Sequence, residues 1–172
     1  MGEFGFKSIT PDNWLEQDPV LRGFAKLGLR GPEQISSSDL LDEILQPQLN
    51  ESVPHEVKAL FEVARGAMCY GYFFYPLYTL TYEQLFRVAE TAVTLKCRSM
   101  SAPARVKSFA QKVEYLIENT IIPDNERLRW QGLRGLRNIA SHPEGQSIVT
   151  PGDAVHELHL IVTIINKLFV GA

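Results

Sequence analysis

The chain has 172 residues, of which 45% are hydrophobic and 22% are charged, and its formal net charge at pH 7 is −3. This length suits one domain with a short appendage, and the composition excludes wholesale disorder, a collagen-like repeat and a long coiled coil. Residues 1–62 carry five basic and eleven acidic side chains, whereas residues 63–172 carry twelve and nine. A binding site for a polyanion is therefore expected in the second part of the chain.

The first 52 residues predict an appendage to a main domain that covers residues 53–172. Glycine and proline are frequent near the N-terminus, where a short helix from about Asp12 to Leu27 is expected, interrupted near Pro19. A second short helix is expected at 39–45, because the three serines just before it are N-cap candidates. The appendage is therefore predicted to be helical.

The main domain shows apolar residues at helical spacing in five successive stretches. They cover residues 55–75 with a kink or break at Pro76, then 82–98, about 104–117, 126–141 and 151–169. The last stretch has the clearest start, because Thr150, Pro151 and Asp153 match a capping box with proline at the first helical position. No strand is expected, since the β-branched runs also have helical spacing. The predicted fold is all-α: an antiparallel bundle of four to five core helices with an N-terminal helical appendage.

Residues 66–82 form an uncharged stretch of 17 residues, which is the lower limit for a membrane span. Its glycines, Pro76 and threonines favour a buried or interface segment, so no membrane association is expected. Seven of the 17 aromatic residues of the chain lie at 70–82. Either a second copy of the chain or the N-terminal appendage would cover such a surface, and the sequence leaves both open.

The cysteines and histidines give no metal-binding pattern. Cys69 and Cys97 lie in apolar surroundings without metal-ligand spacing, which is typical of reduced core residues and of a cytoplasmic protein. No secretory signal is visible at the N-terminus. His156 and His159 share a helix face, but further ligands at suitable spacing are missing. Neither a metal nor another cofactor is expected.

Residues 126–141 carry the most informative pattern. One face of this helix is apolar, and the opposite face carries cationic and hydrogen-bonding groups, namely Arg127, Gln131, Arg134, Asn138 and His142, with Arg137 at its border. One interpretation is a solvated polar face. The other is a site, because Pro143 ends the helix directly after His142 and the imidazole then projects from a helix terminus.

The sequence Arg137-Asn138-Ile-Ala-Ser-His142 resembles the signature of the HEPN superfamily, an arginine and a histidine separated by four to six residues, often with a polar residue after the arginine. The resemblance covers about residues 55–170. It implies a metal-independent endoribonuclease, such as a toxin or a defence effector. In that reaction the RNA 2′-hydroxyl attacks its own phosphodiester and leaves a 2′,3′-cyclic phosphate and a 5′-hydroxyl.

The resemblance also implies roles for the residues of the motif. His142 would be general acid or base, Arg137 would hold the phosphate, and Asn138 would hydrogen-bond the phosphate or the imidazole. A carboxylate from residues 82–98, Glu83 or Glu90 with a slight preference for Glu90, would orient Arg137 or His142. Further substrate contacts are expected from the same polar stripe, at Arg127, Gln131 and Arg134.

Each chain offers one motif histidine, and the resemblance implies a two-fold homodimer that brings two motifs to one cleft. RNA is then the substrate, and an antitoxin or another protein is a further expected partner. Two other interpretations stay open: a non-catalytic HEPN-type module that binds RNA, a nucleotide or a protein, and a structural helical dimer. Trp130, beside the polar stripe, would stack on a base or cover the core.

Overall fold

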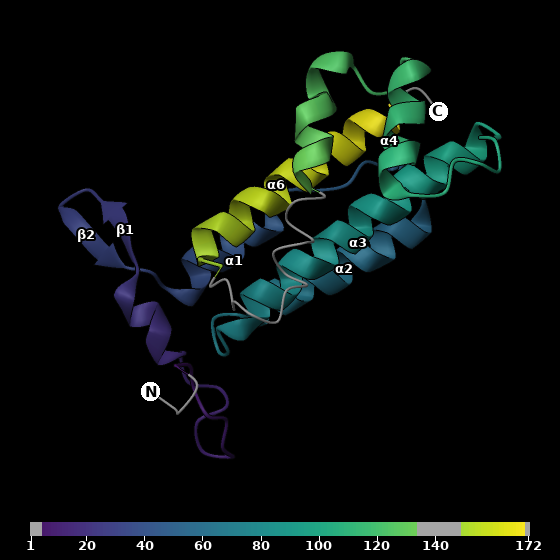
Figure 1. The fold of residues 1–172 in the computed structure, drawn as a ribbon. Helices are drawn as coiled ribbons and strands as arrows, with labels where there is room; N and C mark the ends of the chain where they lie inside the picture. Colours follow the sequence, from purple (N-terminus) through teal and green to yellow (C-terminus); the bar gives the residue numbers. More distant parts are fainter. Residues whose placement is uncertain (1–4, 134–148, 171–172) are drawn as a thin grey trace.

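The computed structural model describes residues 5–133 and 149–170 and shows a mostly helical chain with a small hairpin (Figure 1). In chain order the elements are η1 (Pro19–Gly23), β1 (Ala25–Gly28), β2 (Gly31–Gln34), α1 (Ser37–Leu45), α2 (His55–Tyr70), α3 (Pro76–Ser99), α4 (Phe109–Glu118), η2 (Asp124–Glu126) and α6 (Pro151–Leu168). Residues 127–133, after η2, are also helical. The prediction of a helical fold is confirmed, and the prediction that the chain has no strand is wrong.

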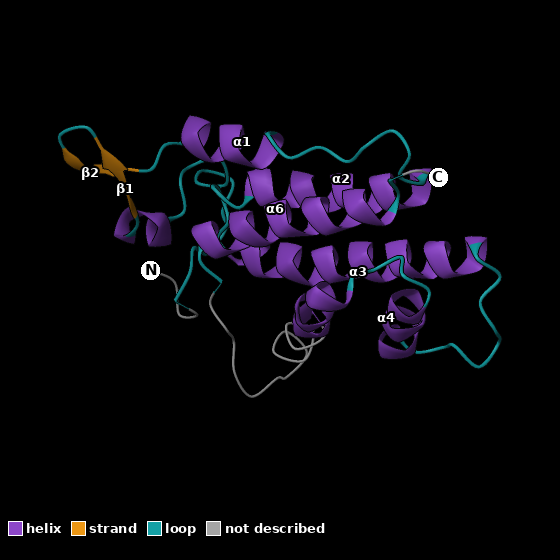
Figure 2. Ribbon diagram, turned by 90° about the horizontal axis from the view of Figure 1, so that it is seen from above, coloured by secondary structure: helices purple, strands orange, loops and turns teal. Residues whose placement is uncertain are grey.

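Helices α2, α3 and α6 pack side by side and form the centre of the molecule. Figure 2 shows α1 on one side of α2 and α6, while α4 lies on the other side, against α3. Helices α2 and α3 run antiparallel, because the Thr81 hydroxyl donates to the carbonyl of Ala64 and the Gln84 amide to that of Leu60. This layer arrangement buries the apolar face of each central helix.

The core consists mainly of aliphatic side chains from these three helices. In the last stretch, six apolar residues at helical spacing are buried: Val155, Leu158, Val162, Ile165, Leu168 and Phe169. Each large aliphatic side chain that leaves water stabilises the fold by roughly 1.5–3 kcal/mol. The helical spacing in the sequence therefore identified the buried face of α6 correctly.

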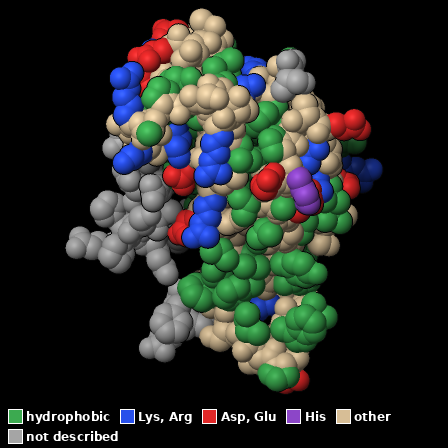
Figure 3. All heavy atoms as spheres, turned by 90° about the vertical axis from the view of Figure 1, so that its right-hand side faces the viewer, with side chains coloured by type: hydrophobic (Ala, Val, Ile, Leu, Met, Phe, Trp, Pro, Cys, Tyr) green, Lys and Arg blue, Asp and Glu red, His purple; other side chains and the backbone are tan. Residues whose placement is uncertain are grey.

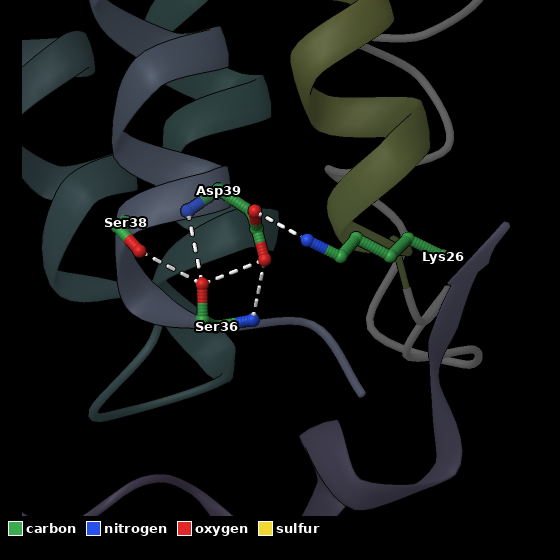
Figure 4. Close-up of polar contacts among 4 residues, drawn as sticks. All are labelled: Lys26, Ser36, Ser38 and Asp39. Atoms are coloured by element: carbon green, nitrogen blue, oxygen red, sulfur yellow. Dashed lines mark hydrogen bonds and ion pairs between the residues drawn. The ribbon is translucent and has the colours of Figure 1, made fainter. Parts of the chain in front are cut away.

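Side-chain caps fix where three of the helices begin. Ser36 accepts from the backbone N–H of Asp39, and Asp39 accepts in return from the N–H of Ser36, so α1 starts with a complete capping box (Figure 4). The Lys26 side chain of β1 forms an ion pair with the same carboxylate. Lys26 and Ser36 together hold the pKa of Asp39 well below its usual range. Thr150 caps α6 as predicted, and Ser108 starts α4 later than the apolar spacing suggested.

Of the kink or break predicted at Pro76, the structure shows a break, and the first helix ends before the predicted Tyr75. Helix α2 ends at Tyr70, and Pro76 is the first residue of α3, where its missing N–H costs nothing. The turn needs glycine at position 71, since a Cβ there would lie 2.7 Å from the Tyr78 ring. The uncharged stretch 66–82 is thus divided between two helices. Among the described helices, none combines the length and the hydrophobicity that a membrane span requires.

The predicted helix from Asp12 to Leu27 does not form. Residues 11–15 are turns, η1 follows, and β1 then pairs antiparallel with β2. The hairpin turn uses Gly31 at φ +123°, a backbone conformation that favours glycine. Because this region has few apolar residues at helical spacing, packing against the rest of the chain decides its conformation.

The N-terminal segment, residues 5–34, covers part of the aromatic turn between α2 and α3. Phe6 contacts Phe74 edge-on at 5.7 Å between ring centroids, and Phe24 stacks on Tyr75 at 6.0 Å. Figure 3 shows hydrophobic side chains gathered at this lower end of the molecule. The sequence left open whether a second copy of the chain or the N-terminal appendage covers these aromatic residues. For Phe74 and Tyr75, the N-terminal segment of the same chain does so.

Asp18 anchors the N-terminal segment to this turn. Its fully buried carboxylate accepts from the backbone N–H of Tyr75 at 2.9 Å and from that of Val20 at 3.1 Å. Its own N–H donates to the carbonyl of Tyr72 at 3.0 Å. One residue thus satisfies polar backbone groups on both sides of the contact.

Candidate functional site

The residues of the predicted motif do not fall in the part of the chain that the structure describes. Arg134, Arg137, Asn138 and His142 lie between residues 133 and 149, and their arrangement stays a prediction. The structure does describe the four other predicted site residues, Glu83, Glu90, Arg127 and Gln131, and the helical segment that leads into the motif.

The helical segment 127–133 packs firmly against α4. Trp130 is 1% exposed and Leu133 is 3% exposed. The Trp130 ring lies 6.5 Å from that of Phe109 in α4, and Phe109 in turn lies 5.2 Å from Phe86 in α3. A row of aromatic contacts thus joins α3, α4 and the segment that precedes the motif. Of the two roles considered for Trp130, this burial supports the core role.

Glu83 and Glu90 lie on α3, three residues before and four residues after Phe86. Glu83 is exposed and Glu90 is half-buried. Neither carboxylate forms an ion pair with a side chain in residues 5–133 or 149–170. Both acids are therefore within about one helical turn of Phe86, and no cation of the described residues is paired with either.

Arg127 is held by two carboxylates from neighbouring elements. Its guanidinium donates to Glu114 of α4 and, at 2.8 Å, to Asp124 of η2. These two hydrogen bonds raise the pKa of Arg127 above its already high value. Both partners of Arg127 lie outside residues 127–133, in α4 and in η2, so the pattern within this helix did not reveal them. The contact ties the start of the segment to α4.

Gln131 is exposed and lines a groove of about 450 Å³ between α4 and the segment 127–133. The groove has an aromatic floor and polar edges, formed by Phe109, Ala110, Gln111, Val113, Glu114, Trp130 and Gln131. The indole N–H of Trp130 has no hydrogen-bond partner in the described part of the chain. A groove of this size is within the range of small-molecule sites.

Sequence reasoning did not identify Glu157 of α6 as unusual. This residue is only 5% exposed, and its Oε1 atom has no hydrogen-bond partner among residues that the structure describes. Burial raises the pKa of Glu157, and burial together with the charge of Glu157 raises the pKa of Tyr82 to about 12. One signal was available: Glu157 stands four residues before Ile161 and seven before Ile164, on a stripe that is otherwise apolar.

The described histidines and cysteines do not form a metal site. Residues 5–133 and 149–170 hold no group of three or more His, Cys, Asp or Glu side chains placed to bind a metal ion. His159 makes a hydrogen bond of 3.2 Å to the carbonyl of Glu43 in α1 and so joins α6 to α1. Cys69 and Cys97 are free, and burial raises the pKa of both thiols, which disfavours the reactive thiolate.

Comparisons with protein-family models, with characterised proteins and with solved structures find no match for this chain.

Proposed function

We propose that the chain is a metal-independent endoribonuclease of HEPN type, which acts as a two-fold dimer with a composite site and serves as a toxin or a defence effector. The observation that carries the proposal is the motif from Arg137 to His142, at the end of a predicted amphipathic helix whose first part, residues 127–133, packs against α4. A packed helix gives catalytic groups a rigid support.

The proposed reaction is a transesterification within the RNA. The 2′-oxygen attacks phosphorus while the bond from phosphorus to the 5′-oxygen breaks. His142 of one copy acts as general base and removes the proton of the 2′-hydroxyl. His142 of the other copy, in its protonated form, acts as general acid and gives a proton to the leaving 5′-oxygen. Arg137 offsets the charge that develops on the phosphate oxygens, and Asn138 supplies a neutral hydrogen bond.

Of the two candidate carboxylates, Glu90 is the better supporting residue. Glu83 lines a groove on the outer side of α2 and α3, with Val63 and Ala67 of α2, and its side chain is exposed. Glu90 is half-buried, and it lies four residues after Phe86, whose ring contacts α4. A partly buried carboxylate holds a cation more tightly than an exposed one, because less water screens the pair.

The predicted phosphate contacts differ in the charge that they can supply. Arg127 already faces two carboxylates, Glu114 and Asp124, so its charge is offset before RNA binds. We therefore assign the phosphate contacts to Arg134 and Arg137, and keep Gln131, which is exposed, as a neutral contact. Substitution of Arg127 is then expected to weaken packing on α4 more than RNA binding.

The test is cleavage of RNA by the full chain with EDTA present. We expect His142→Ala and Arg137→Ala each to reduce the rate by at least about 100-fold, the usual effect of removing a general acid–base group or a charged transition-state contact. His55→Ala and Arg105→Ala are matched controls, because both side chains are exposed and lie outside the motif. Activity that persists in both motif variants would contradict the site, and activity lost in EDTA would contradict the metal-free mechanism.

The second candidate is a non-catalytic HEPN-type module that binds RNA, a nucleotide or a protein such as an antitoxin. The charge balance favours it, because the net charge is −3 and Arg127 is already paired. RNA binding that depends on Arg134 and Arg137, without cleavage of any RNA offered, would support this module over the nuclease.

A further inference from the structure

The outer side of the α2–α3 hairpin exposes apolar side chains around a shallow groove. The groove has a volume of about 160 Å³ and is lined by Val63 and Ala67 of α2 and by Leu80, Glu83, Gln84 and Arg87 of α3. Val63 is 60% exposed, Leu80 is 54% exposed, and Tyr70 on the same side of α2 as Val63 is 61% exposed. Apolar side chains grouped in this way often mark an interaction surface.

Two opposite charges stand at the edge of the groove without pairing to each other. Glu83 and Arg87 are one turn apart on α3, with the acid first, a spacing that normally allows an ion pair within the helix. No such pair forms, and neither side chain is paired with any other within residues 5–133 and 149–170. Both side chains are exposed. A carboxylate and a guanidinium are thus open to an external partner.

This arrangement is complementary to itself. A two-fold axis that crosses α3 between residues 83 and 87 places Glu83 of each copy opposite Arg87 of the other, so that two equivalent ion pairs form. The exposed Leu80 and Val63 line the same groove, so this contact covers them as well. An unrelated partner would need its own matching charges, whereas a second copy supplies them automatically.

The N-terminal segment of the same chain already covers other aromatic side chains of the turn between α2 and α3. Phe6 and Phe24 of the N-terminal segment already contact Phe74 and Tyr75. In α2 and α3 the large hydrophobic side chains that remain exposed are Val63, Tyr70 and Leu80. We propose that two copies of the chain pair through the α2–α3 groove, with antiparallel α3 helices and reciprocal Glu83–Arg87 ion pairs. This inference rests on the proposed function only in so far as a composite site needs a dimer.

The test measures the mass of the full chain in solution by sedimentation. We expect the wild type to form dimers, and Glu83→Arg or Arg87→Glu to weaken dimerisation by at least about tenfold, because each change opposes like charges. An equal mixture of the two variants restores the dimer, since arginine at both positions of one chain then faces glutamate at both positions of the other. The double variant E83R/R87E restores it as well.

Two controls separate the groove from general surface effects. Leu80→Glu is expected to give monomers, whereas Leu128→Glu, at an 80% exposed leucine outside the groove, leaves the dimer intact. Glu118→Arg, at an exposed acid of α4, is the matched control for Glu83→Arg. If Leu80→Glu unfolds the chain, the mixture of charge variants still decides the question.

A wild type that stays monomeric at all concentrations would overturn the proposal, as would a dimer that the charge variants leave unchanged. The measurement uses no RNA, so the two proposals can fail separately. A dimer through the groove without RNA cleavage would contradict the nuclease alone. Cleavage by a dimer that ignores residues 83 and 87 would contradict the groove alone, whereas cleavage by a monomer would contradict both the groove and the composite site.

Discussion

The N-terminal segment and the helical core of α2, α3 and α6 are stabilised in different ways. The core buries many apolar side chains, among them Val57, Leu85 and Leu158, each with no measurable exposure. Residues 5–34 contain one buried hydrophobic residue, Leu21, and are fixed by buried polar groups such as Asp18. Stability in the core is therefore spread over many contacts, whereas in the N-terminal segment it depends on a few directed ones.

The largest effect is expected in the core. Leu158→Ala removes a fully buried side chain of α6 and leaves a cavity, which should lower the free energy of unfolding by about 2–5 kcal/mol. Denaturant unfolding measures this change. Leu41→Ala is the control, because Leu41 is 42% exposed on α1 and should cost far less. Similar losses for the two variants would contradict the assignment of the core.

A smaller and local effect is expected at the anchor of the N-terminal segment. Asp18→Ala leaves the buried N–H of Tyr75 without an acceptor and should lower the free energy of unfolding by about 2 kcal/mol. Hydrogen exchange should show loss of protection at residues 5–34 and at the turn, with α6 unchanged. Asp18→Asn keeps one acceptor oxygen and should cost less. Equal loss of protection throughout the core would show that both regions unfold as one unit.

Substitution of Glu157, the buried acid of α6, is expected to raise the free energy of unfolding, whereas the substitutions above lower it. The pKa of Glu157 is raised in the folded chain, so its contribution is most favourable below the unfolded pKa and is lost as the pH rises through the folded pKa. Glu157→Gln should therefore stabilise the chain by about 1 kcal/mol at pH 7 and reduce the stability loss between acid and neutral pH. Unfolding curves across this pH range measure both effects. A destabilised variant would mean that the carboxylate has a partner.

The smallest effect is expected at α1, where the two regions join. Ser36→Ala removes the N-cap of α1 and should lower the free energy of unfolding by about 1 kcal/mol. Lys26→Ala breaks only the contact from the hairpin to Asp39 and should cost less than the loss of the cap, because the capping box remains. Thermal unfolding compares the two variants. A larger cost for Lys26→Ala would mean that the hairpin contributes to the stability of α1.

The features that could be predicted from the sequence are those that depend on residues close together in the chain, namely helix starts and buried helix faces. The start of α6 followed from Thr150, Pro151 and Asp153, because a cap acts within one helical turn. The buried face of each central helix followed from the spacing of its apolar residues. The expected N-cap serines before α1 include Ser36, which is the cap.

Contacts between distant segments account for what the sequence did not predict. The hairpin at residues 25–34 has no strong pattern of its own, and the break at Gly71 depends on the close approach of Tyr78. The partner of Arg127 in α4, Glu114, is thirteen residues away. For the candidate site, the structure describes where Glu83 and Glu90 stand on α3, while the motif from Arg137 to His142 stays a prediction from the sequence.

The chemistry of the cleaved ends tests the central claim most directly. The full chain is incubated with RNA in the presence of EDTA, and the termini of the fragments are identified by mass spectrometry. We predict 2′,3′-cyclic phosphate and 5′-hydroxyl ends, because the RNA 2′-oxygen is the nucleophile in the proposed reaction and His142 moves the protons. Fragments with 5′-phosphate and 3′-hydroxyl ends, which require an attacking water, would contradict it.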